Sequence, residues 1–225
     1  MMKSILGGLA GAVLLTACGG SDPGSGTQTL YVEVTAASDG SSDGTAVYVV
    51  VRDGSSSAAL VEDAQVTLIG DRGTTYTPGF TSILGIGLGY YKNQINWEGG
   101  WRVRIVRGND NLEAYVAGPG LTEITAPVAS STFMKSSAQN LSVQWRDENG
   151  RAMPNASIKF RRAQTIDRIV QDTGSYSVDF NELVAANDER ITLKRWTEVA
   201  LRGGVTGSKF KAETTDELNL TVQQQ

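Results

Sequence analysis

Histidine is absent from this chain of 225 residues, and cysteine occurs once, at Cys18. Without histidine, the chain lacks the commonest general base and the usual zinc or copper ligand. With a single cysteine, it forms no disulfide within itself and no cysteine metal site. Stability must therefore come from the burial of apolar side chains and from backbone pairing.

The chain also lacks a long hydrophobic run and a basic patch. The uncharged segment from Ile5 to Leu15 is about half of the roughly 20 residues that a membrane-spanning helix needs. Lysine and arginine total 20 against 24 acidic residues, and no basic segment is interleaved with aromatics, so we expect no nucleic-acid partner. Phosphate-binding glycine loops, nucleophile elbows and zinc motifs are missing as well, so we expect no cofactor and no metal.

The N-terminal segment has the three graded parts of a secretory signal peptide. Lys3 lies in a short head, the apolar run follows, and small residues then lead to the cysteine. The tetrapeptide Leu15-Thr16-Ala17-Cys18 resembles the lipobox of bacterial lipoproteins, which signal peptidase II cleaves before the cysteine. The resemblance implies that residues 1–17 are a removed signal peptide and that Cys18 carries acyl chains that bind the membrane.

The residues after Cys18 bear on location. Two or more acyl chains give stable anchoring, whereas one binds membranes only marginally. Gly19 and Gly20 stand where many Gram-negative inner-membrane lipoproteins have aspartate, so the resemblance favours the outer membrane, with its periplasmic or surface face left open. Residues 18–28 contain no large apolar residue and indicate a flexible, lipidated tether. The alternative for Cys18 is a free buried thiol.

Alternating apolar and polar residues predict β-strands from residue 30 onward. Leu30, Val32 and Val34 share one face of such a strand, and turns rich in glycine, asparagine and aspartate recur at short spacing. This spacing is typical of a β-sandwich. The Pro/Ala/Ser segment 128–138 is predicted to be a linker between a first sandwich at 29–127 and a second at 139–225.

A weak internal repeat supports two similar domains. Glu62–Leu68 parallels Pro154–Phe160, and each is followed by a strand that begins with glycine and tyrosine, at Gly89 and at Gly174. The pattern resembles the immunoglobulin-like and carboxypeptidase-regulatory-like modules of bacterial surface proteins. The resemblance implies an all-β fold of two tandem immunoglobulin-like antiparallel β-sandwiches.

The segment Gly70–Gly89 is long for a connection, and long loops in compact domains are often functional. If exposed, its apolar side chains would form a surface for a protein partner. The alternative is an edge strand, interrupted by glycines, that packs onto the sandwich. The candidate partner-binding residues are Phe80, Ile83, Leu84 and Ile86.

Strand parity separates the tryptophans. Trp101 and Trp145 share parity with apolar neighbours and are expected in the core. Trp196 shares parity with Lys194 and Glu198, so it is the candidate exposed aromatic and could stack on a sugar ring.

Charged residues offer weaker candidates. Asp39 with Asp43, and Asp147 with Asn149, have the ligand type of calcium loops without their spacing, and turn formation explains them equally well. Arg102 and Arg104 form a basic stripe on the outer face of a strand, which is either a solvated face or a contact for anionic polysaccharide or lipid.

Together these features predict a non-enzymatic, lipid-anchored cell-envelope protein that acts as a binding or structural module. Its expected partner is another envelope protein, which the sequence does not identify. A carbohydrate-binding envelope module is the alternative, with a glycan as ligand. A hydrolase that works through carboxylates has the least support, because no particular pair is indicated.

Overall fold

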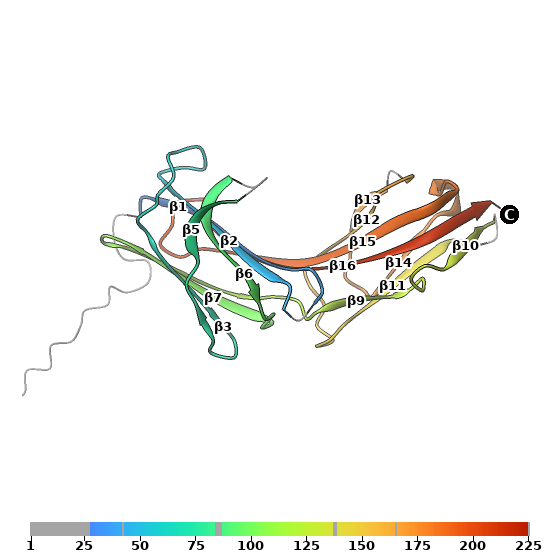
Figure 1. Cartoon of the computed structure of the whole chain (residues 1–225), viewed down its shortest axis with the longest axis horizontal. Helices are drawn as coiled ribbons and strands as arrows, with labels where there is room; N and C mark the ends of the chain where they lie inside the picture. The colour runs from blue at the N-terminus through green and yellow to red at the C-terminus, as the bar shows by residue number, and fades with distance from the viewer. Residues whose placement is uncertain (1–27, 42, 84–86, 137–138, 165, 225) are drawn as a thin grey trace, which may run out of the picture.

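The computed structural model describes residues 28–41, 43–83, 87–136, 139–164 and 166–224. The predicted signal peptide, the lipobox Leu15–Cys18 and nearly all of the tether lie outside these residues, so lipidation of Cys18 stays a prediction. Figure 1 shows an elongated molecule of two lobes, with two long strands running from one lobe into the other. Among the described residues, no helix is long and apolar enough to cross a membrane.

Strands account for nearly all of the regular structure, as the alternating sequence pattern predicts. The first lobe contains β1 (Leu30–Ser38), β2 (Thr45–Asp53), β3 (Gln65–Gly70), β4 (Thr75–Tyr76), β5 (Gly79–Ile83), β6 (Gly87–Ile95), β7 (Gly100–Arg107) and β8 (Asp110–Ala117). The second contains β9 (Thr122–Ala126), β10 (Thr132–Lys135), β11 (Leu141–Asp147), β12 (Asn155–Phe160), β13 (Asp167–Val170), β14 (Ser175–Val178) and the short 3₁₀ turn η1 (Phe180–Glu182). The hairpin of β15 (Ala186–Ala200) and β16 (Lys209–Gln224) belongs to both lobes.

One continuous sheet forms the upper layer of both lobes in Figure 1. Its strand order is β13-β12-β15-β16-β1-β2-β6-β5, with β10 also paired to β16. The first half of β16 lies parallel to β1, from Glu33 opposite Lys209 to Ser38 opposite Thr214, and its last residues pair with β10. At about 3.3 Å per residue, the 15 and 16 residues of β15 and β16 extend about 50 Å, which joins the two lobes.

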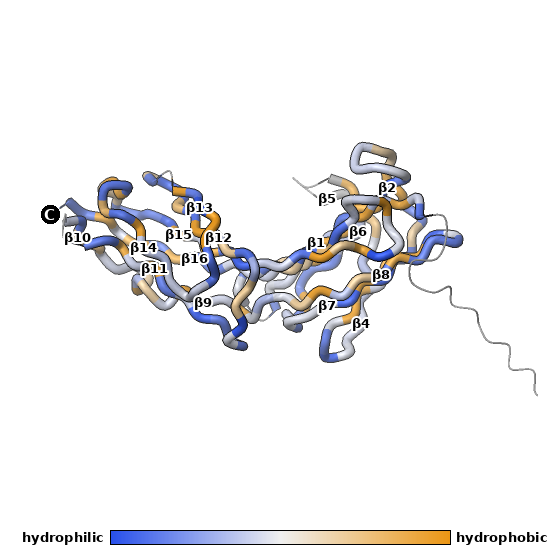
Figure 2. Tube along the Cα trace, turned by 180° about the vertical axis from the view of Figure 1, so that it is seen from behind, coloured by the Kyte–Doolittle hydropathy of each residue, from blue (hydrophilic) through white to orange (hydrophobic). Residues whose placement is uncertain are grey.

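Two smaller sheets complete the sandwiches. The sheet β4-β3-β7-β8 belongs to the first lobe and the sheet β14-β11-β9 to the second. Because side chains alternate along a strand, the even-numbered residues of β16 face inward in both lobes: Phe210 and Ala212 enter the first core, and Leu218 and Leu220 enter the second. Figure 2 shows the hydrophobic stretches within the strands of each lobe.

The predicted all-β class with successive antiparallel β-sandwiches is confirmed, and two parallel pairs, β1 with β16 and β10 with β16, are additions to it. The cores do not divide the chain at one point. Ile124, which precedes the predicted linker, packs in the second core, while Phe210 near the C-terminus packs in the first. The ranges 29–127 and 139–225 therefore stay a prediction about folding units.

The tryptophans that parity assigned to the interior are buried. Trp101 is 0% exposed and Trp145 is 5% exposed. Trp97 lies beside Trp101, with ring centroids 6.0 Å apart at an interplanar angle of 63°, and its Nε1 donates to the carbonyl of Pro119 at 2.8 Å. This edge-to-face packing closes the end of the first core that borders the second lobe.

Candidate functional site

The apolar alternation of the long hairpin is interrupted where it passes from one lobe to the other. The inward residues of β15 are Ile191, Leu193, Arg195, Thr197 and Val199, and those of β16 are Phe210, Ala212, Thr214, Asp216 and Leu218. A layer of polar groups therefore separates the two cores. The other elements that meet at this layer come from both lobes, so it is the candidate functional site.

Arg195 lies at the centre of this layer, and its side chain is only 2% exposed. Its Nη2 is 2.6 Å from Oδ2 of Asp172, in the loop before β14, and its Nε is 3.0 Å from both oxygens of that carboxylate. Its Nη1 donates to Oδ2 of Asp147, at the end of β11, and its Nη2 also donates to the carbonyl of Arg151 at 2.6 Å. We call Arg195, Asp147 and Asp172 the Arg195 node.

The two carboxylates of the Arg195 node have further donors. Asp172 accepts from Nε1 of Trp145 at 2.8 Å and from the amide of Met153 at 2.6 Å. Asp147 accepts from the amides of Gly120 at 2.9 Å and Asn149 at 2.6 Å. A buried ion pair is tolerated only when hydrogen bonds satisfy the remaining polar groups, and this node meets that condition.

Hydrogen bonds between Asp172 and Arg195 keep these two side chains charged. Burial acts to raise the pKa of Asp172, but hydrogen bonds from Arg195, Met153 and Trp145 outweigh it, so the pKa lies below its usual value. Burial acts to lower the pKa of Arg195, and its bonds to Asp172 and Asp147 raise it above the usual value instead. Neither group is therefore poised to exchange a proton near neutral pH.

A second set of polar contacts fastens β9 to β16 at the junction. The hydroxyls of Thr122 and Thr214 lie 2.6 Å apart, and the amide of Ile124 donates to Oδ2 of Asp216 at 2.6 Å. The turn after β1 also reaches this place, because a side chain at Gly40 would come within 2.9 Å of the carbonyl of Thr215. The junction is thus held from the first lobe, the second lobe and the hairpin together.

A hollow of about 650 Å³ opens beside the node. Among its acidic side chains, Glu123 is paired with Arg146 at 2.5 Å, Asp216 is bonded to the amide of Ile124, and Asp147 is held by Arg195. Among the described residues, no group of three or more acidic side chains is placed to hold a metal ion. The arrangement suits holding strands together better than proton transfer.

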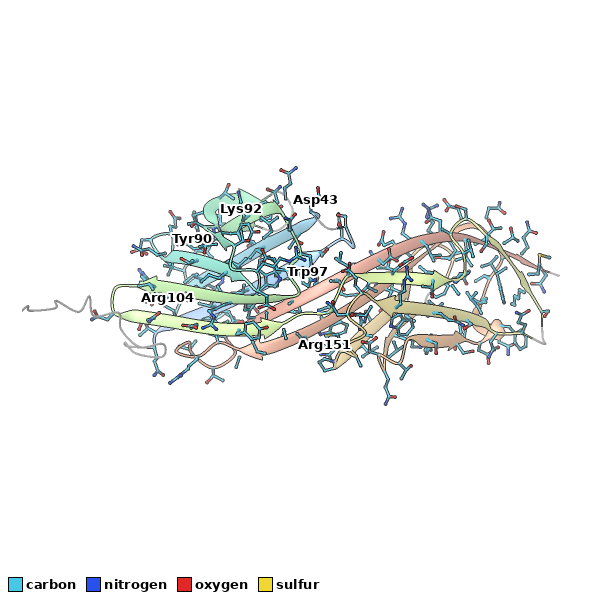
Figure 3. All side chains as sticks on the ribbon, turned by 90° about the horizontal axis from the view of Figure 1, so that it is seen from below. Asp43, Tyr90, Lys92, Trp97, Arg104 and Arg151 are labelled. Atoms are coloured by element: carbon cyan, nitrogen blue, oxygen red, sulfur yellow. The ribbon has the colours of Figure 1, made fainter. Side chains whose placement is uncertain are left out.

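Three of the four residues weighed as calcium ligands, Asp39, Asp147 and Asn149, have hydrogen-bond partners within the protein. Asp147 belongs to the Arg195 node. Oδ1 of Asp39 accepts from the amide of Ser41 at 3.0 Å and from its hydroxyl at 2.6 Å, and these bonds hold the pKa of Asp39 below its usual value. The backbone amide of Asn149 donates to Oδ1 of Asp147 within their turn. Asp43 is exposed (Figure 3). Turn formation accounts for what the structure shows of these residues.

The candidate partner-binding loop is described in part. Phe80 lies in β5, the edge strand, opposite Tyr90 of β6, and their ring centroids are 5.2 Å apart. Phe80 is half-buried against the first core, which fits the edge-strand interpretation of this residue. Leu84, Ile86 and the side chain of Ile83 lie outside the described residues, so the loop as a partner surface stays a prediction.

Trp196 lies on the outward face of β15 and is half-buried, not fully exposed. It stands between Asn155 of β12 and Glu213 of β16. The carboxylate of Glu213 is paired with Lys194 at 2.9 Å and with Lys211 at 2.8 Å, so a charged cluster borders the tryptophan. A role for Trp196 in binding stays a prediction.

Arg102 and Arg104 lie on the outward face of β7, as strand parity predicts. Figure 3 labels Arg104 on this strand. Nη1 of Arg102 is 2.7 Å from Glu113, and Nε of Arg104 is 3.2 Å from Oδ1 of Asn111. Both arginines are therefore paired with side chains of β8 on a solvent-facing surface.

Sequence reasoning missed the Arg195 node and a further buried carboxylate, that of Glu189. Glu189 is 0% exposed and accepts from the amides of Arg161, Arg162, Ala163, Gln164 and Arg190. The signal for Arg195 was present as an arginine at a position where strand parity calls for an apolar residue, after Ile191 and Leu193. No local pattern points to its partners.

Comparison with known proteins gives no family. No family model and no curated protein matches this chain. Among solved structures, it is similar to fibronectin(III)-like modules of Clostridium thermocellum CbhA, with 11% identity over 86% of this chain and 94% of that chain and a TM-score of 0.30.

Two adhesins are also similar to this chain. A bacterial ice-binding adhesin of 1.5 MDa shows 14% identity over 87% of this chain and 65% of that one, with a TM-score of 0.27. The Yersinia pseudotuberculosis adhesin InvE shows 13% identity over 88% of this chain and 60% of that one, with a TM-score of 0.24. TM-scores this low identify no shared function.

Proposed function

We propose that this chain is a non-enzymatic, lipid-anchored cell-envelope protein whose two lobes act as one rigid binding or structural module. Acyl chains on Cys18 anchor it to the outer membrane of a Gram-negative bacterium. The module works through contacts with another envelope protein.

The observation that carries this proposal is the hairpin of β15 and β16, which belongs to both sandwiches. A jointed pair of domains is connected by a linker with few contacts, and relative motion is then the default. Here the continuous sheet and the Arg195 node resist bending at the junction. A rigid body on a flexible tether presents its binding surface away from the membrane, within the reach of the tether.

The state of the carboxylates supports the non-enzymatic part. The buried carboxylates of Asp147, Asp172 and Glu189 are each held by several donors, and the pKa of Asp172 is lowered. A general acid needs a raised pKa and a general base needs access to its substrate. Asp172 has a lowered pKa instead, and the carboxylates of all three residues are buried away from a substrate.

The anchor is tested by intact mass and by fractionation of the wild type and of Cys18→Ala. The wild type should carry the mass of acyl chains and sediment with outer membranes, and the variant should carry no lipid and leave that fraction. A wild type without the lipid mass contradicts the anchor.

The module is tested by affinity capture from detergent-solubilised membranes with the acylated wild type. We expect one envelope protein at fixed stoichiometry, retained after washing at high salt. Capture of nothing by a fully acylated, folded protein contradicts the protein-contact part and leaves the anchor standing.

A further inference from the structure

A ladder of polar and aromatic side chains crosses the outward face of the continuous sheet in the first lobe. Glu33 and Thr35 of β1 alternate with buried valines, and strand register places neighbours beside them on four other strands. One rung comprises Glu198, Lys211, Thr35, Tyr48 and Tyr91, and the next comprises Ala200, Lys209, Glu33 and Val50. The face is therefore unlike the apolar inward face of the same strands.

A hollow of about 280 Å³ lies between these rungs. Tyr48 and Val50 line it from β2, and the charged side chains of Glu33, Glu198, Lys209 and Lys211 surround it. Pockets that bind small ligands combine an apolar or aromatic wall with a few convergent polar groups, and this hollow has both.

The aromatic wall is held in place. The hydroxyl of Tyr48 donates to the carbonyl of Leu88 at 3.0 Å. Its ring lies over Gly89, where a side chain would come within 2.7 Å of the ring and 2.8 Å of the carbonyl of Val49. A ring fixed before binding loses little conformational freedom when a ligand packs against it.

Lys211 is paired with Glu213 at 2.8 Å, whereas Lys209 is paired only loosely with the two glutamates of the hollow. Nζ of Lys209 is 3.4 Å from Glu198 and 3.9 Å from Glu33, longer than the roughly 2.7 to 2.9 Å of a charge-assisted hydrogen bond. The side chains of Lys209, Glu33 and Glu198 are 43%, 42% and 41% exposed. Their donors and acceptors are therefore accessible to a ligand that enters the hollow.

The balance of charge selects the ligand. The two carboxylates would repel a polyanion, and the two ammonium groups would repel a polycation. Carboxylates and ammonium groups alike form hydrogen bonds with hydroxyl groups. A fixed tyrosine ring beside them suits a molecule with an apolar face and many hydroxyls. We propose that this hollow binds one residue of a neutral saccharide, with the sugar ring against Tyr48 and its hydroxyls bonded to Glu33, Glu198 and Lys209.

This inference goes beyond the proposed function and does not rest on it. The test is calorimetric titration of the folded protein with neutral hexasaccharides of glucose, N-acetylglucosamine, mannose and galactose. We expect saturable binding of at least one of them, and at least a tenfold weaker affinity in Tyr48→Ala. The matched control is Tyr115→Ala, which removes a 48% exposed tyrosine from β8 in the other sheet and should bind as the wild type does.

A second variant separates binding from folding, because Tyr48 also packs over Gly89. Replacing Glu33 and Glu198 together by glutamine keeps their shape and weakens their hydrogen bonds to hydroxyls, so the affinity should fall at least tenfold with little change in melting temperature. Saturable binding to none of the four hexasaccharides overturns the proposal. So does unchanged affinity in the double variant.

Discussion

Nη2 of Arg195 lies 2.6 Å from Oδ2 of Asp172, and both side chains are 2% exposed in the layer that separates the two cores. The arginine comes from the strand that both lobes share, and the aspartate comes from a loop of the second lobe alone. Their contact therefore fixes the second lobe to the strand that continues into the first. It is also the place where a single substitution should do most harm.

Replacing Arg195 by methionine should lower the free energy of unfolding by about 3 to 5 kcal/mol, because it leaves two buried carboxylates without their cation. Urea denaturation followed by tryptophan fluorescence measures this. Arg102→Met is the control, since that arginine is 54% exposed in its pair with Glu113 and its loss should change stability by less than about 1 kcal/mol. Equal losses in the two variants would contradict a special role for the junction.

Acid should weaken the protein through Asp172. Its pKa is lowered in the folded state, so near pH 4 the unfolded chain binds more protons than the folded one. The stability that this group contributes is present above its unfolded pKa and is lost as the pH falls through its folded pKa. Urea denaturation at pH 5, 4 and 3 should show a smaller acid-dependent loss of stability in Asp172→Asn than in the wild type, and an equal loss in the two proteins would contradict this prediction.

Glu189→Gln should loosen the segment after β12. The glutamine has one acceptor oxygen and presents an amide group to backbone donors that the carboxylate satisfied, so we expect a loss of about 2 kcal/mol or more. Hydrogen exchange of the amides of residues 161–164 should become faster than in the wild type. Glu182→Gln, whose partner is the exposed Arg168, should leave those amides protected, and protection retained in both variants would count against the assignment.

Gly89→Ala should destabilise the first lobe by about 1 to 3 kcal/mol, because the added methyl group would lie 2.8 Å from the carbonyl of Val49, which the sheet holds in place. Gly79→Ala in the neighbouring edge strand is the control, since a side chain there meets no atom within 4 Å among the described residues. Thermal denaturation of both variants checks this. A neutral Gly89→Ala would show that Tyr48 and β6 can move apart.

A fragment of residues 29–127 should not unfold cooperatively. It lacks β16, whose Phe210 and Ala212 fill the first core and whose backbone pairs with β1. The loss leaves an open edge on β1 and a cavity beneath it. Calorimetry of the fragment and of residues 28–225 makes the comparison, and a fragment that melts in a single sharp transition near that of the longer chain would support the domain ranges predicted from sequence.

The sequence predicted much of the local structure. The alternation of Leu30, Val32 and Val34 predicted both the strand β1 and the face that it buries, and parity placed Trp101 and Trp145 in the core. Such patterns are readable because side chains alternate between the two faces of any strand, whatever that strand pairs with. The edge strand at Phe80 was one of two interpretations that the sequence left open.

The sequence did not predict which distant segments contact one another. The amide of Val32 donates to the hydroxyl of Ser208 at 3.1 Å, across 176 positions of the chain, and β1 lies parallel to β16. The partners of Arg195 come from two separate segments, around Asp147 and around Asp172.

By itself, then, the sequence determined the all-β class, the succession of two sandwiches, and the faces of the strands. Only the tertiary structure decided that the sandwiches share one hairpin and where a buried arginine finds its carboxylates. The physical reason is that periodicity records whether each residue is buried or exposed. Strand pairing and buried ion pairs depend instead on which distant segments meet, and strands with the same alternating pattern could pair with one another in many ways.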